Sequence, residues 1–116
     1  MYHVDEHVVL ELHDEIDIAA ALQVRPYLDD ATRHDRPSLV IDLTPVTFID
    51  CAGLGLLAHA HQRVTERQGR IRVVCPHPRA LWLLRTTGLH RVVPQAPDVA
   101  TALGRDGRGA PPRAGV

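Results

Sequence analysis

The 116-residue sequence predicts an α/β fold: a small, mixed but mostly parallel sheet of four or five strands with helices packed on it. Two observations predict this fold. Short runs that are apolar, or that alternate polar and apolar residues, are typical of strands. Along the chain they alternate with longer stretches of helical periodicity. Pro and Gly residues stand between these segments, where they end one element before the next begins. Such alternation is typical of a layered α/β domain with a mainly parallel sheet.

The N-terminal third contains two strand-like runs followed by a helical one. Residues 7–12 form an apolar β-type run, which we expect to pair antiparallel at an edge of the sheet. Residues 15–18 alternate polar and apolar side chains and predict a second short strand. Residues 19–33 carry apolar side chains at steps of three and four, which predicts a helix with Asp17 as its N-cap. Pro26 lies inside this run and predicts a kink or a later start.

The middle of the chain predicts a buried strand and a second helix. Four apolar residues within 38–43 follow a Pro and are typical of a strand that is buried on both faces. Residues 46–49 are again strand-like and lead into a Gly-containing segment. A helix is predicted over residues 52–67, where apolar side chains share one stripe and Gly69 follows as a terminator.

The last part of the domain predicts two more strand–helix pairs. Residues 71–75 and 91–93 are strand-like, and residues 78–87 begin with Pro and are followed by Gly, as expected of a helix. A short final helix is predicted over residues 97–103. We therefore expect one domain over residues 1–103 and a disordered tail over residues 104–116, which has almost no apolar side chains.

Composition restricts the classes of partner. The formal net charge is −1, so no overall field attracts nucleic acid or anionic lipid. The first residues include acidic side chains where a signal peptide would have a basic and then an apolar region, and the apolar runs are shorter than a membrane span. The expectation is a cytoplasmic protein without a nucleic-acid or membrane partner.

The segment 50–55, with the sequence Asp-Cys-Ala-Gly-Leu-Gly, is the most informative in the chain. A strand-like run leads into it, and its two glycines stand at the start of a predicted helix. Glycine permits the close approach of another backbone, and the free N–H groups of a helix N-terminus suit a capping carboxylate or an anion. Asp50 is placed to cap this helix. By themselves, these features indicate a capped helix start and a functional site about equally.

Three collinear segments resemble the STAS family, which is named for sulphate transporters and anti-sigma factor antagonists. The segment 50–55 is similar to the family's Asp-Ser-(Ser/Thr/Ala)-Gly-Leu-Gly motif. The segment 14–17, Asp-Glu-Ile-Asp, is similar to its Gly-Glu-(Leu/Ile)-Asp stretch before the first helix, with Asp14 in place of Gly. The segment 87–93 resembles its Thr-Gly-Leu followed by a short strand.

The resemblance implies a binding module and not an enzyme. Its partner would be an anti-sigma factor of the histidine-kinase-type ATPase fold, and it would use neither a cofactor nor a metal. In the family's bacterial antagonists, the residue after the motif Asp is a serine that this kinase phosphorylates; here it is Cys51, which implies that phosphorylation at this position is lost. The partner-binding residues implied by the resemblance are Asp17, Asp50, Cys51, Gly53, Leu54 and Gly55.

Two other functions remain open for Cys51. A thiol at a helix N-terminus can act as a redox sensor, although no resolving cysteine lies close in the sequence. A thiol enzyme would need a nearby base, and His59 and His61 lie two to three turns up the helix, on different faces, which also makes them a poor metal pair.

Three other features are interpreted as structural. Cys75 before a Pro indicates a small buried hydrophobe, and Trp82 indicates a core residue beside two leucines. The arginines at 63, 67, 70 and 72 indicate a solvated basic face.

Overall fold

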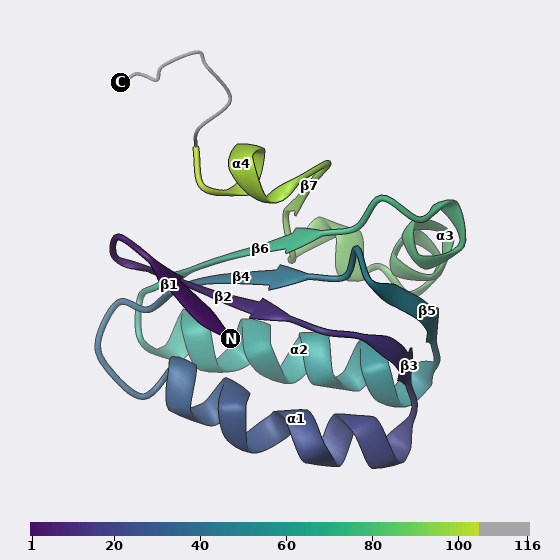
Figure 1. Cartoon of the computed structure of the whole chain (residues 1–116), viewed down its shortest axis with the longest axis horizontal. Coiled ribbons are helices and arrows are strands. Elements are labelled where there is room, and N and C mark those ends of the chain that lie inside the picture. Colours follow the sequence, from purple (N-terminus) through teal and green to yellow (C-terminus); the bar gives the residue numbers. More distant parts are fainter. Residues whose placement is uncertain (105–116) are drawn as a thin grey trace.

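The computed structural model describes residues 1–104, which form a five-stranded sheet with helices on both faces (Figure 1). The strand order is β1-β2-β4-β6-β7. Only β1 runs antiparallel to its neighbour, and the other neighbouring pairs are parallel. The predicted mixed and mostly parallel sheet is therefore confirmed. The strands are β1 Tyr2–Val4, β2 His7–Glu11, β4 Ser38–Asp42, β6 Arg70–Val74 and β7 Gln95–Ala96.

Two long helices cover one face of this sheet and a short one covers the other (Figure 1). Apolar side chains point to both faces because successive residues of a strand alternate in direction. Val8 and Leu39 face the side of the long helices, whereas Val9 and Val40 belong to a smaller cluster with the short helix. The helices are α1 Ile18–Ala31, α2 Cys51–Glu66, α3 Pro78–Thr87 and α4 Val99–Ala102, with a 3-10 turn η1 at Leu89–Arg91.

A separate pair of strands lies at one end of the sheet. β3 Asp14–Ile16 and β5 Val46–Ile49 pair in parallel, and Ile16 is opposite Ile49. Each of these strands leads directly into a long helix: β3 into α1, and β5 into α2. This second pairing places the first residues of α1 and α2 at the same end of the molecule.

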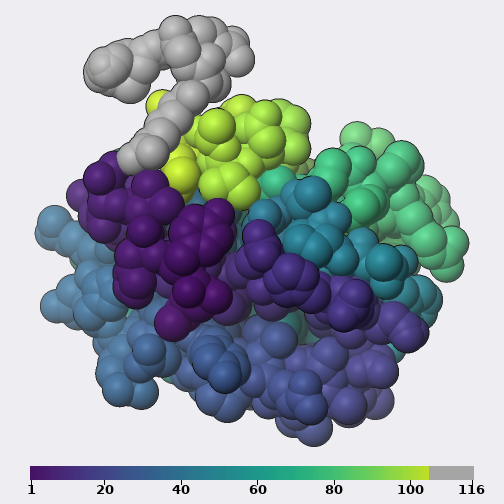
Figure 2. Space-filling model, in the orientation of Figure 1, coloured from purple at the N-terminus to yellow at the C-terminus, as the bar shows by residue number. Residues whose placement is uncertain are grey.

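Residues 7–12 pair antiparallel with β1, as predicted, but the prediction that they form an edge strand is wrong. β2 lies between β1 and β4 and is parallel to β4. Val8, Val9 and Leu10 are all buried, so this run is apolar on both faces and has neighbours on both sides. The antiparallel edge strand is Tyr2–Val4, which Figure 2 shows beside the α4 segment.

The prediction of a strand over residues 91–93 is also wrong. Gly88 ends α3 with a positive φ of 80°, and the chain continues into the η1 turn. Pro94 has no N–H to donate, but its carbonyl accepts from the Val73 amide, and the last strand begins only at Gln95. The position of this strand is therefore set by its pairing with β6 and not by the valines before it.

Three other expectations about single residues can be compared with the structure. α1 begins at Ile18 and continues across Pro26, so the later start is wrong. Trp82 is 58% exposed, which contradicts its assignment to the core; Ala80 and Leu84, four residues apart, form the buried face of α3. Cys75 is buried, as predicted.

Two further observations concern the ends and helices of the chain. The expected tail lies, apart from Gly104, outside the described residues. Within residues 1–104, no helix combines the length and the apolar character that crossing a bilayer requires.

Candidate functional site

Two aspartates begin the two long helices side by side. β3 and β5 are parallel and in register at Ile16 and Ile49, so the residue after each strand stands at the same edge. Asp17 accepts a hydrogen bond from the Ala20 amide at 3.0 Å and caps α1. The N-cap of α2 is formed in the same way by Asp50. Both capping predictions are therefore confirmed.

The Asp50 carboxylate accepts hydrogen bonds from two of the free backbone amides at the start of α2. Its Oδ1 accepts from the Ala52 amide at 2.8 Å and from the Gly53 amide at 3.3 Å. These N–H groups are therefore satisfied, and the negative charge offsets part of the positive helix end. Cys51 is the first residue of the helix and is exposed. Its side chain thus stands beside a carboxylate at the surface.

Gly53 allows α2 to touch the two short strands. A Cβ on Gly53 would lie 2.3 Å from Cγ1 of Ile49 and 3.1 Å from Cγ2 of Ile16, too close for an ordinary contact. Leu54, its neighbour, is 6% exposed and belongs to the main core. Gly53 and Leu54 therefore face the interior and position the helix start. Both residues are buried, so neither is presented to solvent.

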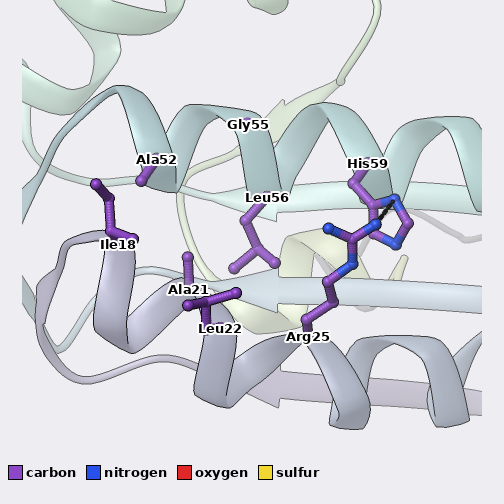
Figure 3. A pocket seen from close by; sticks show the side chains of 8 residues that line it. All are labelled: Ile18, Ala21, Leu22, Arg25, Ala52, Gly55, Leu56 and His59. Carbon is purple, nitrogen blue, oxygen red and sulfur yellow. Dashed lines mark hydrogen bonds between the residues drawn. The ribbon is translucent and has the colours of Figure 1, made fainter.

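Gly55 has a different environment from Gly53. It is exposed, and a Cβ placed on it would meet nothing within 4 Å. It borders a groove of about 290 Å³ between α1 and α2, drawn in Figure 3. On the α1 side, Ile18 and Leu22 line the groove and are 69% and 65% exposed. The absence of a side chain at Gly55 thus keeps open one wall of an apolar groove.

The far end of the groove is polar. His59 of α2 lies there with Arg25 of α1, whose Nη2 is 3.5 Å from the His59 Nδ1 (Figure 3). The other ring nitrogen, Nε2, lies 2.9 Å from Oδ1 of Asp29. This hydrogen bond is the main cause that lowers the pKa of Asp29, with the charge of Arg63 adding to it. The groove therefore has an apolar part at Ala52, the residue after Cys51, and a polar part about two turns further along.

Arg63 completes the connection between the two helices. Its Nε donates to the Thr32 hydroxyl at 2.7 Å, and its Nη2 donates to the Asp29 carbonyl at 3.0 Å. Sequence reasoning considered His59 only as a base or a metal ligand and Arg63 as part of a solvated face. The i, i+4 spacing of these two residues places them on the same face of α2, and their hydrogen bonds show that this face contacts α1.

The four arginines of the predicted basic face do not form one cluster. Arg63 contacts α1, whereas Arg70 and Arg72 lie on β6. No group of three or more His, Cys, Asp or Glu side chains that could hold a metal ion occurs within residues 1–104.

Asp14 stands where the resembled motif has glycine, and the backbone conformation at this position explains why glycine is preferred there. Its φ is 60°, in the left-handed region that glycine adopts freely. Aspartate is one of the few other residue types that tolerate this region. The left-handed conformation at the first residue of β3 is therefore adopted without glycine, and a carboxylate is added near the start of α1.

Comparisons with known proteins concern the family and the fold of this chain. The STAS domain family model matches residues 1–102. An anti-sigma F factor antagonist of Paenibacillus polymyxa is 26% identical over 97 residues, which cover 83% of each chain. A Mycobacterium tuberculosis protein named as a candidate anti-anti-sigma factor is 36% identical over 67 residues, 58% of this chain. That match spans 45% of the relative, less than half its length.

A solved structure extends the agreement to the fold. The crystal structure of a candidate anti-sigma factor antagonist from Thermotoga maritima has a TM-score of 0.81 at 23% identity, and the match covers 90% of this chain and 91% of that one. The family model covers nearly all of the described residues, including both capped helix starts. This chain therefore belongs to the STAS domain family, and its relatives include proteins named as anti-sigma factor antagonists.

Proposed function

We propose that this protein is a cytoplasmic anti-sigma factor antagonist that regulates transcription by partner switching. It binds an anti-sigma factor of the histidine-kinase-type ATPase fold by surface contact and catalyses no reaction itself. The observation that carries the proposal is the pair of helix starts at Asp17 and Asp50, where the exposed Cys51 stands near an apolar groove. The antagonist names of the relatives support the same reading.

The proposed docking surface, which we call the helix-start surface, consists of Asp17, Ile18, Leu22, Cys51 and Gly55. Ile18 and Leu22 expose most of their area, and apolar side chains beside a groove are suited to anchor a partner. Gly55 leaves space for a partner side chain at the groove wall. Gly53 and Leu54, which are buried, contribute by positioning this surface.

The substitution of serine by Cys51 removes a switch. A phosphorylated serine at this place would add about two negative charges beside Asp50. Such charges would weaken docking to an apolar or acidic partner surface. Cysteine has nearly the size of serine but is no substrate for an ordinary serine kinase, so this protein stays competent for binding when its relatives would be released.

The first test adds a charge at two positions of the same helix. Full-length protein serves as bait in native cell extract, the captured kinase-fold protein is purified, and its Kd is measured with Cys51→Asp and with Gln62→Asp. Gln62 is exposed and lies eleven residues along α2, about 16 Å away. An acidic residue at a helix start does not weaken the helix, so Cys51→Asp should fold normally.

We expect Cys51→Asp to bind at least about tenfold more weakly, while Gln62→Asp binds like the wild type. Equal affinities of the two variants would contradict the proposed surface. Failure of the wild type to capture any kinase-fold ATPase would contradict the proposed partner.

The second test concerns the lost switch. Wild type and Cys51→Ser are incubated with the captured kinase and ATP, and the products are analysed by mass spectrometry. We expect no phosphate on the wild type and one phosphate on Ser at position 51 of the variant. Phosphate on Cys51 itself would contradict the unswitchable antagonist. An unmodified Cys51→Ser would mean that the surface has lost recognition as well as its acceptor.

A redox-responsive module is the second candidate function, and the exposure of Cys51 favours it. The other cysteine, Cys75, is buried, and burial raises the pKa of its thiol. Labelling with iodoacetamide should therefore modify Cys51 in the folded protein and Cys75 only after unfolding. A sensor requires more: mild peroxide must oxidise Cys51 reversibly and change the affinity for the captured partner. If oxidation leaves that affinity unchanged, the redox function is excluded and the antagonist function is unaffected.

A further inference from the structure

A second polar hollow lies at the end of the sheet opposite the helix-start surface. Here the strands β2, β4 and β6 begin, and their first residues are in register: His7 pairs with Ser38, and Ser38 pairs with Arg70. Residues paired in this way on neighbouring strands project from the same face of a sheet. The three side chains therefore form a row on the face that carries α4.

Turns on both sides complete this hollow. It measures about 560 Å³, and the turn residues Arg36 and Gln68, both with positive φ, border it together with the row. Gly69 lies at its wall, where a Cβ would be 2.1 Å from the Pro37 carbonyl, so the two turns touch through a residue without a side chain. A smaller adjoining hollow of about 170 Å³ shares His7, Ser38 and Arg70 and adds Arg72.

The charge of the hollow is positive although the whole chain carries −1. Arg36, Arg70 and Arg72 form no ion pair with a carboxylate within residues 1–104. Glu6 is the one carboxylate among the residues that line the two hollows. Two guanidinium groups therefore border each hollow, with Arg70 shared between them, and Glu6 is the opposing charge of the larger one.

Hydroxyl and imidazole groups supply further hydrogen-bonding capacity. The His7 Nδ1 and the Ser38 Oγ are 2.5 Å apart and joined by a hydrogen bond, which fixes both side chains in the row. Arg72 is oriented by a hydrogen bond from its Nη1 to the Ile71 carbonyl at 2.9 Å. Arginine binds phosphate oxygens in a bidentate manner, and a serine hydroxyl can donate to a third oxygen.

We propose that this hollow, between the beginnings of β2, β4 and β6, binds the phosphate group of a small phosphate monoester. The phosphate lies where this hollow meets the smaller one: Arg70 and Ser38, which border both hollows, bind its oxygens, while Arg72 approaches from the smaller hollow and Arg36 from the larger one. The volume of the larger hollow lies in the range of small-molecule pockets. One water occupies about 30 Å³ and a phosphate is only a few times larger, so the hollow has more space than a bare phosphate needs. The remaining space accommodates the organic part. This site is independent of the helix-start surface.

The experiment is a titration of full-length protein with ribose 5-phosphate, followed by two-dimensional amide NMR. Inorganic phosphate and ribose are titrated in parallel. We expect saturable shifts at His7, Ser38 and Arg70 with both phosphate compounds, and none with ribose. Shifts that do not saturate, or that saturate only at residues of other regions, would overturn the proposal. Shifts with inorganic phosphate but not with ribose 5-phosphate would overturn the monoester assignment.

Variants connect the shifts to the charges. The double variant Arg70→Gln/Arg72→Gln should bind ribose 5-phosphate at least about tenfold more weakly than a control with Arg79→Gln and Arg85→Gln, two exposed arginines of α3. Both double variants remove two positive charges, so the comparison separates the site from overall charge. Glu6→Gln should bind more tightly because the opposing carboxylate is gone. Equal affinities of the two double variants would overturn the proposal.

Discussion

At the scale of single residues, the two glycines of the segment 50–55 have different environments. Gly53 is in the close contact between α2 and the two short strands, where a Cβ would lie 2.3 Å from Ile49. Gly55 has free space around it and no positive φ, so neither packing nor backbone conformation demands glycine there. Glycine inside a helix reduces stability relative to alanine. The groove that Gly55 borders thus explains why a glycine that lowers helix stability stands there.

This difference predicts opposite effects of the same substitution. Gly53→Ala should lower the free energy of unfolding by about 1–3 kcal/mol, because the added methyl forces α2 away from Ile16 and Ile49. Gly55→Ala should raise it by about 0.5–1 kcal/mol, because alanine favours the helix and meets no neighbour. Urea unfolding of both variants measures these changes. A change of the same sign in both would contradict the assigned roles.

At the scale of elements, the polar contacts of Asp29 hold the C-terminal half of α1 against α2. Oδ1 of Asp29 lies 2.9 Å from His59 and 3.3 Å from Nε of Arg63. Arg63 also contacts Thr32, whose hydroxyl is buried and donates to the Leu28 carbonyl. His59 also lines the groove between the two helices, so these contacts lie next to its polar end.

The lowered pKa of Asp29 predicts a pH-dependent contribution to stability. A carboxyl whose pKa is lower in the folded state stabilises the fold above its unfolded pKa, about 3.9, and this contribution is lost as pH falls through the folded value. The advantage of the wild type over Asp29→Asn should therefore shrink between pH 5 and about pH 2.5.

Urea unfolding at both pH values measures this effect. Asp30→Asn is the matched control, since the Asp30 carboxylate is exposed and pairs with Arg33 at 3.4 Å on the surface. If the Asp29→Asn difference is constant across this range, or if the control changes as much, the Asp29 contacts do not supply the stability.

At the scale of the whole molecule, the two faces of the sheet are covered unequally. α1 and α2 cover one face with a large core, while on the other face Val9, Val40 and Val74 pack with β1 and the short α4 (Figure 1). Val99 and Ala102 of α4 and the following Leu103 are partly buried against these valines. These contacts join α4 to the sheet, although the helix has only four residues.

Two truncations test where the domain ends. Removal of every residue after Leu103 keeps the contacts of α4 with the valines, so the melting temperature should change by no more than about 2 °C. Removal of every residue after Pro97 exposes part of Val9, Val40 and Val74 and should cost at least about 1.5 kcal/mol. Thermal unfolding of both proteins measures this. A large loss from the first truncation would show that residues beyond 103 stabilise the domain.

Local features of the sequence were sufficient to predict the α/β class, the three main helices and both aspartate caps. Helical periodicity, N-cap residues and helix-terminating glycines act within a few positions, so their signals are contained in short segments. The segment 50–55 could be recognised for the same reason, since its residues are adjacent along the chain.

Only the tertiary structure decided which neighbours each segment contacts. The place of β2 inside the sheet and the late strand at Gln95 depend on pairing with distant strands, which a single run of residues does not specify. The burial of Leu54, the exposure of Trp82 and the contact of Asp29 with His59, thirty residues apart, arise only when the helices pack. The sequence by itself thus determined the elements and the motif. Packing decided which motif residues reach the surface, because burial is a property of contacts between elements.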